Sequence, residues 1–141
     1  MKFWDASAII PLLIDEPSRP SLLAVLDDDP GMLAWWGTPV EIMSALARRE
    51  RESLLTSDEV ENALVSARAL SDSWYEIVPS AAVRRTAERL LRAHALRAAD
   101  SLQLAAALIA ANHDPATIDV VCLDDRLSAV ARREGFTVIS T

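Results

Sequence analysis

Short apolar runs alternate along the chain with longer segments in which apolar residues recur every three or four positions. The short runs are typical of buried strands, and they predict strands over 2–5, 32–36, 75–78, 119–123 and 136–139. The longer segments predict helices, most clearly over 39–53, 57–71, 80–95, 101–112 and 125–134. Strands that alternate with helices predict an α/β fold, with a mostly parallel central sheet of four to five strands flanked by helices.

The connections between the strands add detail to this prediction. Two helices are expected between the second and third strands, and two more between the third and fourth. Thr56 and Glu59 have the spacing of a capping box, which would begin the helix over 57–71. Segment 101–112 carries no charge, so its helix should be buried against the sheet. Since no repeat, low-complexity tract or linker interrupts the pattern, residues 1–141 are expected to form a single domain.

Composition is typical of a globular protein, with 51% hydrophobic and 25% charged residues. No apolar stretch reaches the roughly 18 residues that cross a bilayer, so no membrane association is expected. The N-terminal residues lack the apolar core and cleavage site of a signal peptide. Cys122, the single cysteine, cannot form an internal disulfide. A cytoplasmic location is therefore expected.

The charge pattern permits two interpretations. The net charge of −7 argues against nucleic acid as a partner. However, Lys2 is the only lysine among 14 basic residues, and the others are arginines, whose planar guanidinium groups bind phosphate with two parallel hydrogen bonds. Alternatively, these arginines lie on solvated helix faces and pair with nearby glutamates.

The predicted topology places four acidic residues at one edge of the sheet. Asp5 and Asp124 each follow a strand, and the ends of parallel strands meet at the same edge. Glu41 lies in the first turn of the helix that leaves the second strand. Asp100 begins the helix that runs back toward the fourth strand, so it also lies near this edge. Ligands of open α/β sheets bind here.

Helix capping could explain three of these acids one at a time. Residues 38–41, Thr-Pro-Val-Glu, have the pattern of a capping box with proline in the first helical position. Asp100 and Asp124 could each be an N-cap or a first-turn acid favoured by the helix dipole. Asp5 is harder to explain in this way, because Ser7 is the better candidate for the cap of the following helix.

Taken together, the four acids favour a metal site. Carboxylates that converge on one edge repel one another unless a cation lies among them. A site with oxygen ligands alone suits Mg²⁺ or Mn²⁺. His94 and His113 are expected at helix ends rather than as ligands.

Other phosphate chemistries do not fit the sequence. With glycine only at positions 31, 37 and 135, the chain has no P-loop and no dinucleotide-binding fingerprint. A phosphoaspartate mechanism would need an active-site lysine, and Lys2 lies at the wrong end of the first strand.

The four acids lie in the segments FWDASAII, PVEIMSALARRER, LRAADSLQLAAAL and VVCLDDRLSAVARREGFTVI. In this order, the segments resemble the motifs of PIN-domain ribonucleases, and at this length the chain is most similar to the VapC-type toxins of bacterial toxin–antitoxin pairs. The resemblance implies that Asp5, Glu41, Asp100 and Asp124 hold Mg²⁺ or Mn²⁺ and carry catalysis. It also implies that the hydroxyl of Ser7 helps to order the site.

The implied activity is hydrolysis of RNA phosphodiester bonds by a homodimeric toxin that an antitoxin protein covers. Arg97 and Arg48 are candidates for contacts to the RNA backbone. The chain departs from the family at Cys122, where serine or threonine is usual, and at Ser101, where alanine is usual. The rival hypothesis is a catalytically inactive PIN-like module that binds another protein and whose acids only cap helices.

Overall fold

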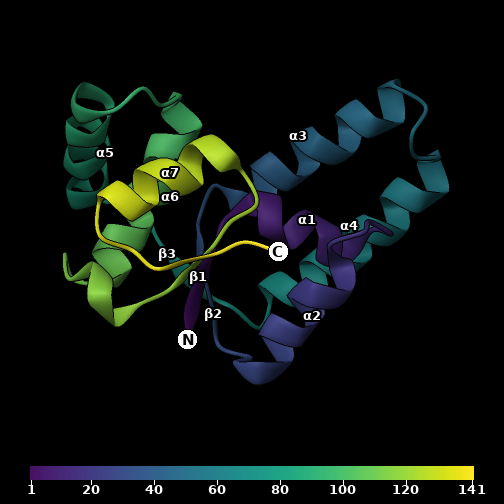
Figure 1. The fold of residues 1–141 in the computed structure, drawn as a ribbon. Coiled ribbons are helices and arrows are strands. Elements are labelled where there is room, and N and C mark those ends of the chain that lie inside the picture. The colour runs from purple at the N-terminus through teal and green to yellow at the C-terminus, as the bar shows by residue number, and fades with distance from the viewer.

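Five short parallel strands form the centre of the protein in the computed structural model, which describes residues 1–141 (Figure 1). The strands lie in the order β3-β2-β1-β4-β5, and every neighbouring pair is parallel. Their bounds are β1 Lys2–Trp4, β2 Met32–Trp35, β3 Tyr75–Ile77, β4 Val120–Val121 and β5 Val138–Ile139. The predicted α/β class is confirmed, and the sheet is parallel throughout.

The central strand β1 divides the interior into two cores. Phe3 pairs with Leu33 of β2 and with Val120 of β4, and its side chain packs in one core. Trp4 is fully buried in the other core. Successive side chains of a strand point to opposite faces, so β1 contributes one aromatic ring to each layer.

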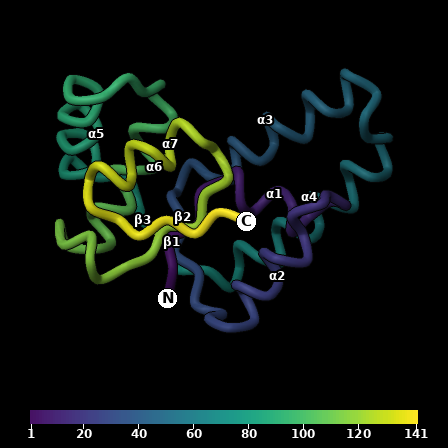
Figure 2. Tube along the Cα trace, viewed as in Figure 1, coloured from purple at the N-terminus to yellow at the C-terminus, as the bar shows by residue number.

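The helices cover the two faces in chain order. The Trp4 face packs against α1 Ala6–Leu13, α2 Arg19–Asp28, α3 Thr38–Arg51 and α4 Ser57–Ser71. The Phe3 face packs against α5 Ala81–Ala93, α6 Ala98–Ala110 and α7 Asp125–Arg133. A short 3₁₀ helix, Pro115–Thr117, precedes β4. Figure 2 shows this division, with α1–α4 to the right of the sheet and α5–α7 to the left.

The predicted connections are confirmed, with small shifts at the helix ends. Two helices separate β2 from β3, and two more separate β3 from β4. The capping box of α4 is present, with Glu59 N donating to Thr56 Oγ1 and Thr56 N donating to Glu59 Oε1. Helix α6 begins at Ala98 rather than at residue 101, which places Asp100 inside its first turn.

Helix α6 is buried as its lack of charge predicted. Its residues from Leu104 to Leu108 are at most 3% exposed, and it packs against α5, α7 and the sheet. Ser101 and Gln103 are its buried polar residues, each at 1% exposure. None of the helices has the length and apolarity that a membrane span requires.

Candidate active site

All four predicted acids lie at the carboxyl edge of the sheet. Asp5 directly follows β1, and Asp124 lies between β4 and α7. Glu41 and Asp100 lie in the first turns of α3 and α6. Their charges act on one another: Asp100 and Asp124 raise the pKa of Asp5, and Asp5 and Asp100 raise that of Glu41. The topology therefore brings four carboxylates from four chain segments to one edge.

Asp5 caps helix α1, contrary to the prediction that Ser7 is the cap. The Oδ2 atom of Asp5 accepts hydrogen bonds from Ser7 N at 3.0 Å and from Ser7 Oγ at 2.5 Å. Asp5 keeps an extended backbone at the end of β1, which is the conformation of an N-cap, whereas Ser7 is already helical. Ser7 Oγ also accepts from Leu123 N at 3.0 Å, so the serine joins the ends of β1 and β4.

Burial dominates the ionisation of Asp5, which is 5% exposed. Loss of solvent raises the pKa of this carboxyl, and the two hydrogen bonds from Ser7 oppose the rise. The negative charges of Asp100 and Asp124 raise the pKa further. A cation at this edge would relieve the repulsion.

Glu41 is not part of a capping box, so the alternative capping interpretation is wrong for this acid. The N-cap of α3 is Gly37, and Thr38 is the first residue of the helix. The side chains of Thr38 and Glu41 instead accept hydrogen bonds from Gln103 of α6. Its Nε2 donates to Glu41 Oε2 at 2.6 Å and to Thr38 Oγ1 at 3.0 Å.

Gln103 was missed by the sequence analysis. The signal was present, because Gln103 is the central polar residue of the uncharged segment expected to be buried. A buried amide requires hydrogen-bond partners, and these have to come from another element. Gln103 Oε1 has no partner in the structure.

The pKa of Glu41 is raised to about 7. Burial is the main cause, the hydrogen bond from Gln103 opposes it, and the charges of Asp5 and Asp100 add to it. A carboxyl with a pKa near neutrality can both accept and release a proton under physiological conditions. In the metal-free protein, Glu41 can therefore exchange a proton near neutral pH.

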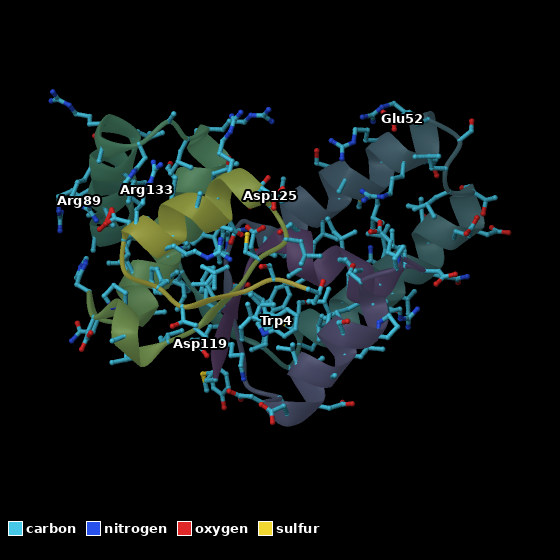
Figure 3. All side chains as sticks on the ribbon, in the orientation of Figure 1. Trp4, Glu52, Arg89, Asp119, Asp125 and Arg133 are labelled. Atoms are coloured by element: carbon cyan, nitrogen blue, oxygen red, sulfur yellow. The ribbon has the colours of Figure 1, made fainter.

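Asp100 and Asp124 line a polar cavity of about 320 Å³ together with Arg97, Asp125 and Arg126. Figure 3 labels Asp125, which marks this edge between α7 and α3. The predicted rim arginine Arg97 is present, and Arg126 is a second one that the sequence analysis missed. Both guanidinium groups oppose the rise in the pKa of Asp100 that burial and then Asp124 cause.

The capping interpretation is confirmed for Asp124 and wrong for Asp100 as an N-cap. Asp124 Oδ1 accepts from Leu127 N at 2.8 Å at the start of α7. Asp100 is a first-turn acid of α6, where Arg97 holds the N-cap position. The other predicted rim arginine, Arg48, lies in the last turn of α3, about two turns beyond Glu41. It does not line the acidic cavity.

Cys122 lies among these groups. Its Sγ is 3.8 Å from Asp5 Oδ2, 3.7 Å from Ser7 Oγ and 3.6 Å from the carbonyl oxygen of Asp124. Burial, and then the charge of Asp5, raise the pKa of the thiol to about 12, so Cys122 is a neutral, weak hydrogen-bond donor. Ser101 Oγ donates to the carbonyl oxygen of Ala98 at 2.7 Å within α6.

The donor chemistry fits Mg²⁺ or Mn²⁺, since the edge offers four carboxylates and one hydroxyl and no nitrogen or thiolate. His94 ends α5 and His113 follows α6, as predicted. No three histidine, cysteine or acidic side chains are arranged to hold a metal ion. Three of the four carboxylates instead accept hydrogen bonds from Ser7, Gln103 and Leu127. Ligation would require the carboxylates to draw closer together.

Two ribonucleases of Mycobacterium tuberculosis are similar to the whole chain. They are Ribonuclease VapC45 of strain CDC 1551 / Oshkosh and Ribonuclease VapC49 of strain ATCC 25618 / H37Rv. Each is 35% identical over 139 residues, which cover 96% of this chain and 92% of the relative. The chain belongs to the VapC ribonuclease family. No family model matches it.

Solved structures share the VapC fold of this chain at low sequence identity. A toxin–antitoxin complex from Klebsiella pneumoniae superimposes with a TM-score of 0.68 at 16% identity, covering 99% of this chain and 97% of that one. FitAcB from Neisseria gonorrhoeae gives a TM-score of 0.65 at 18% identity, with the same two coverages. At these identities the likeness establishes the architecture, which agrees with the predicted PIN-like fold.

Proposed function

We propose that this protein is a metal-dependent endoribonuclease that hydrolyses RNA phosphodiester bonds, with residues 1–141 acting as one nuclease domain. The observation that carries the proposal is the meeting of Asp5, Glu41, Asp100 and Asp124 at the carboxyl edge. Burial and mutual repulsion there raise the pKa of the first three. The names of the two M. tuberculosis relatives support the same activity.

The four carboxylates would hold one or two Mg²⁺ or Mn²⁺ ions. A bound divalent cation supplies Lewis-acid polarisation of the phosphate and activates water at neutral pH. It would also explain how an acidic protein binds a polyanion, because the cation would offset the negative charge of the carboxylates and bind the phosphate directly.

The chain's own residues would orient the reactants. Ser7 fixes Asp5 through two hydrogen bonds to one carboxylate oxygen. Gln103 fixes Oε2 of Glu41 by a hydrogen bond. Glu41 or Asp100 would accept the proton of the attacking water if its carboxylate is not bound to the metal. Arg97 and Arg126 line the cavity beside Asp100 and would bind the phosphate backbone.

The test is cleavage of total cellular RNA by the purified protein with Mn²⁺, with Mg²⁺ and with EDTA. Cleavage should require the metal and should disappear in Asp100→Asn. Full-rate cleavage in EDTA would exclude the metal mechanism. Duplex DNA should resist cleavage under the same conditions, because the net charge of −7 disfavours non-specific duplex binding.

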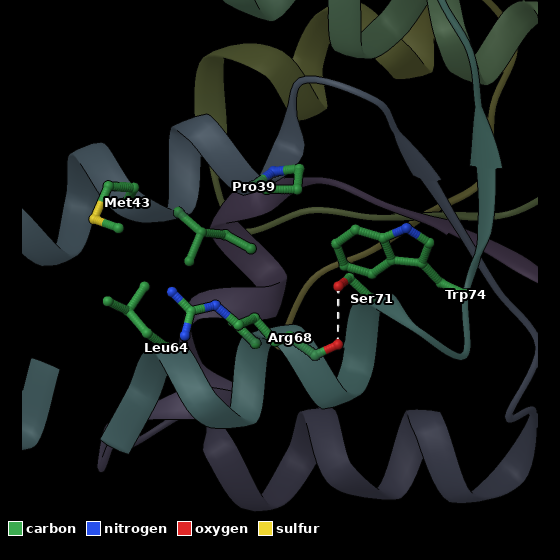
Figure 4. A pocket seen from close by; sticks show the side chains of 8 residues that line it. Pro39, Met43, Leu64, Arg68, Ser71 and Trp74 are labelled. Atoms are coloured by element: carbon green, nitrogen blue, oxygen red, sulfur yellow. Dashed lines mark hydrogen bonds between the residues drawn. The ribbon is translucent and has the colours of Figure 1, made fainter. Parts of the chain in front are cut away.

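We further propose that the protein is the toxin of a type II toxin–antitoxin pair and acts on RNA in the cytoplasm as a homodimer. A pocket of about 140 Å³ between α3 and α4 offers a site for the antitoxin (Figure 4). Its apolar lining includes Ile42, Leu64 and Trp74, and Met43 beside them is 42% exposed. Expression of the chain should arrest bacterial growth, and Asp100→Asn should abolish the arrest.

A catalytically inactive PIN-like interaction module is the alternative. It is favoured by the hydrogen bonds that already occupy three of the four carboxylates, two of which cap helices. The two functions differ in metal binding, because unrelated caps have no affinity for Mn²⁺. A metal-dependent rise in melting temperature would support the enzyme.

A further inference from the structure

Trp36 is an exposed tryptophan at the same edge as the acids. Its side chain is 53% exposed, whereas Trp4, Trp35 and Trp74 are at most 8% exposed. It directly follows β2 and precedes Glu41 by five residues. The chain therefore presents a large aromatic ring to solvent close to the candidate active site.

The turn that carries Trp36 is held in place on two sides. Trp36 N donates to the carbonyl oxygen of Ile77 at 3.0 Å, which extends the pairing of β2 with β3. The Trp36 ring packs edge-to-face on Trp35, with centroids 6.4 Å apart and planes at 70°. A Cβ atom at Gly37 would lie 2.5 Å from Trp35 Nε1, so glycine is needed for this packing. The exposed indole is thus preorganised.

Trp36 borders a cavity of about 370 Å³, a size within the range of ligand sites. Arg84, Ser80 and Leu102 also line it, and no acidic residue does. Arg84 is exposed and forms no salt bridge, although the protein has a net charge of −7. Leu102 follows Asp100 by two residues in α6, so the same helix contributes a residue to this cavity and a carboxylate to the acidic edge.

We propose that this cavity binds an unpaired base of single-stranded RNA beside the cleaved bond, with Trp36 stacking on the base and Arg84 contacting a neighbouring phosphate. The inference rests on the proposed ribonuclease function and adds a binding subsite to it. An aromatic ring with an unpaired arginine is the combination that binds single-stranded nucleic acid, because every base offers a π-face and every nucleotide a phosphate. The cavity is lined by Arg84 and by no acidic residue, so its charge is complementary to that of an anionic nucleotide.

The experiment separates the base from the phosphate. The full-length protein is titrated in EDTA, so that no cleavage occurs, with two fluorescently labelled eight-nucleotide probes. One is oligoadenylate, and the other is an abasic oligoribonucleotide with the same number of phosphates. Wild type should bind the oligoadenylate about 5- to 100-fold more tightly than the abasic probe. Trp36→Ala should lose most of this preference, and Trp36→Phe should keep most of it.

Tyr75→Ala provides the matched control, since Tyr75 is an aromatic residue of similar exposure, 60%, that does not line the cavity. It should bind both probes as wild type does. Arg84→Gln should weaken binding of both probes by the same factor, because it removes a phosphate contact. Circular dichroism and gel filtration of every variant check the fold and the oligomeric state.

Three outcomes would overturn the subsite. The first is that Trp36→Ala binds oligoadenylate as tightly as wild type does. The second is that Trp36→Ala loses affinity for both probes by the same factor. The third is that Trp36→Ala converts a dimer to a monomer, which would make Trp36 a protein contact. A cleavage assay with Mn²⁺ distinguishes the two proposals. Wild-type cleavage with an unchanged KM in Trp36→Ala would reject the subsite and leave the ribonuclease intact. Base-dependent binding without any cleavage would reject the ribonuclease alone.

Discussion

Gln103 Nε2 lies 2.6 Å from Glu41 Oε2 and joins two helices across 62 residues of sequence. The amide is buried in α6, and the carboxylate stands in the first turn of α3. The same nitrogen donates to Thr38 Oγ1, so one side chain of α6 holds the start of α3 at two points. This contact holds Glu41 in position, and it opposes the rise in the pKa of Glu41 that burial causes.

Loss of the Gln103 amide should therefore impair catalysis through Glu41. We expect Gln103→Leu to reduce cleavage by about 10- to 100-fold, a typical cost of removing a group that orients a catalytic residue. Because the hydrogen bond lowers the pKa of Glu41 in the metal-free protein, its loss should extend the pH-dependent fall in stability to higher pH in thermal melts with EDTA. Thr38→Val is the control, because it removes the other acceptor only. An unchanged pH dependence of stability in Gln103→Leu would contradict the effect of the amide on the pKa of Glu41.

Glu41 should make the metal-free protein less stable at alkaline pH. Its pKa is about 7 in the folded state against 4.5 for an unperturbed glutamate, so the folded state binds the proton more tightly. Stability should fall as pH rises from 4.5 through 7. Above pH 7, ionised Glu41 should lower the free energy of unfolding by on the order of 1 kcal/mol, after allowance for solvent screening.

Thermal melts of Glu41→Gln in EDTA check this expectation. At pH 8 the variant should melt a few degrees above wild type, and at pH 4.5 the difference should be close to zero. Glu61→Gln, at an exposed position of α4, should melt like wild type at both pH values. A Glu41→Gln effect of the same size at both pH values would contradict the assigned ionisation.

Metal binding should stabilise the folded protein through Asp100. Mn²⁺ at 100 times its dissociation constant should add about 2.7 kcal/mol to the free energy of unfolding. Asp100→Asn should lose this stabilisation, while its metal-free melting temperature stays unchanged or rises because one repelling charge is removed. Asp58→Asn, another first-turn helix acid, should keep the whole metal response. A full response in Asp100→Asn would remove Asp100 from the ligands.

Capping and catalysis can be separated at Asp124. Asparagine caps a helix about as well as aspartate, so Asp124→Asn should keep the bond from Leu127 N and the stability of α7. Asp124→Ala removes the capping side chain, so it should lower the free energy of unfolding by about 1 kcal/mol. Cleavage should fall at least 100-fold in both variants if Asp124 is a ligand. Near-normal cleavage by a well-folded Asp124→Asn would leave this residue as a cap alone.

The sequence predicted the sheet and the gathering of acids better than it predicted local capping. Hydrophobic periodicity and connection order were enough to place strand ends and helix starts at one edge. The errors lay in choosing among adjacent cap candidates, Asp5 against Ser7 and Gly37 against Thr38. Which residue caps the helix depends on the backbone dihedral angles where each strand ends. Residue spacing does not reveal these angles.

The sequence by itself determined that four carboxylates lie at the carboxyl edge of a parallel sheet, because strand direction and connection length leave them no other edge. Tertiary structure alone decided their partners and their environment. The contact of Gln103 with Glu41 and the cavity between Trp36 and Arg84 depend on how helices distant in sequence pack together. The pKa of about 7 for Glu41 depends on burial, since solvent leaves a carboxyl group only when the folded chain encloses it.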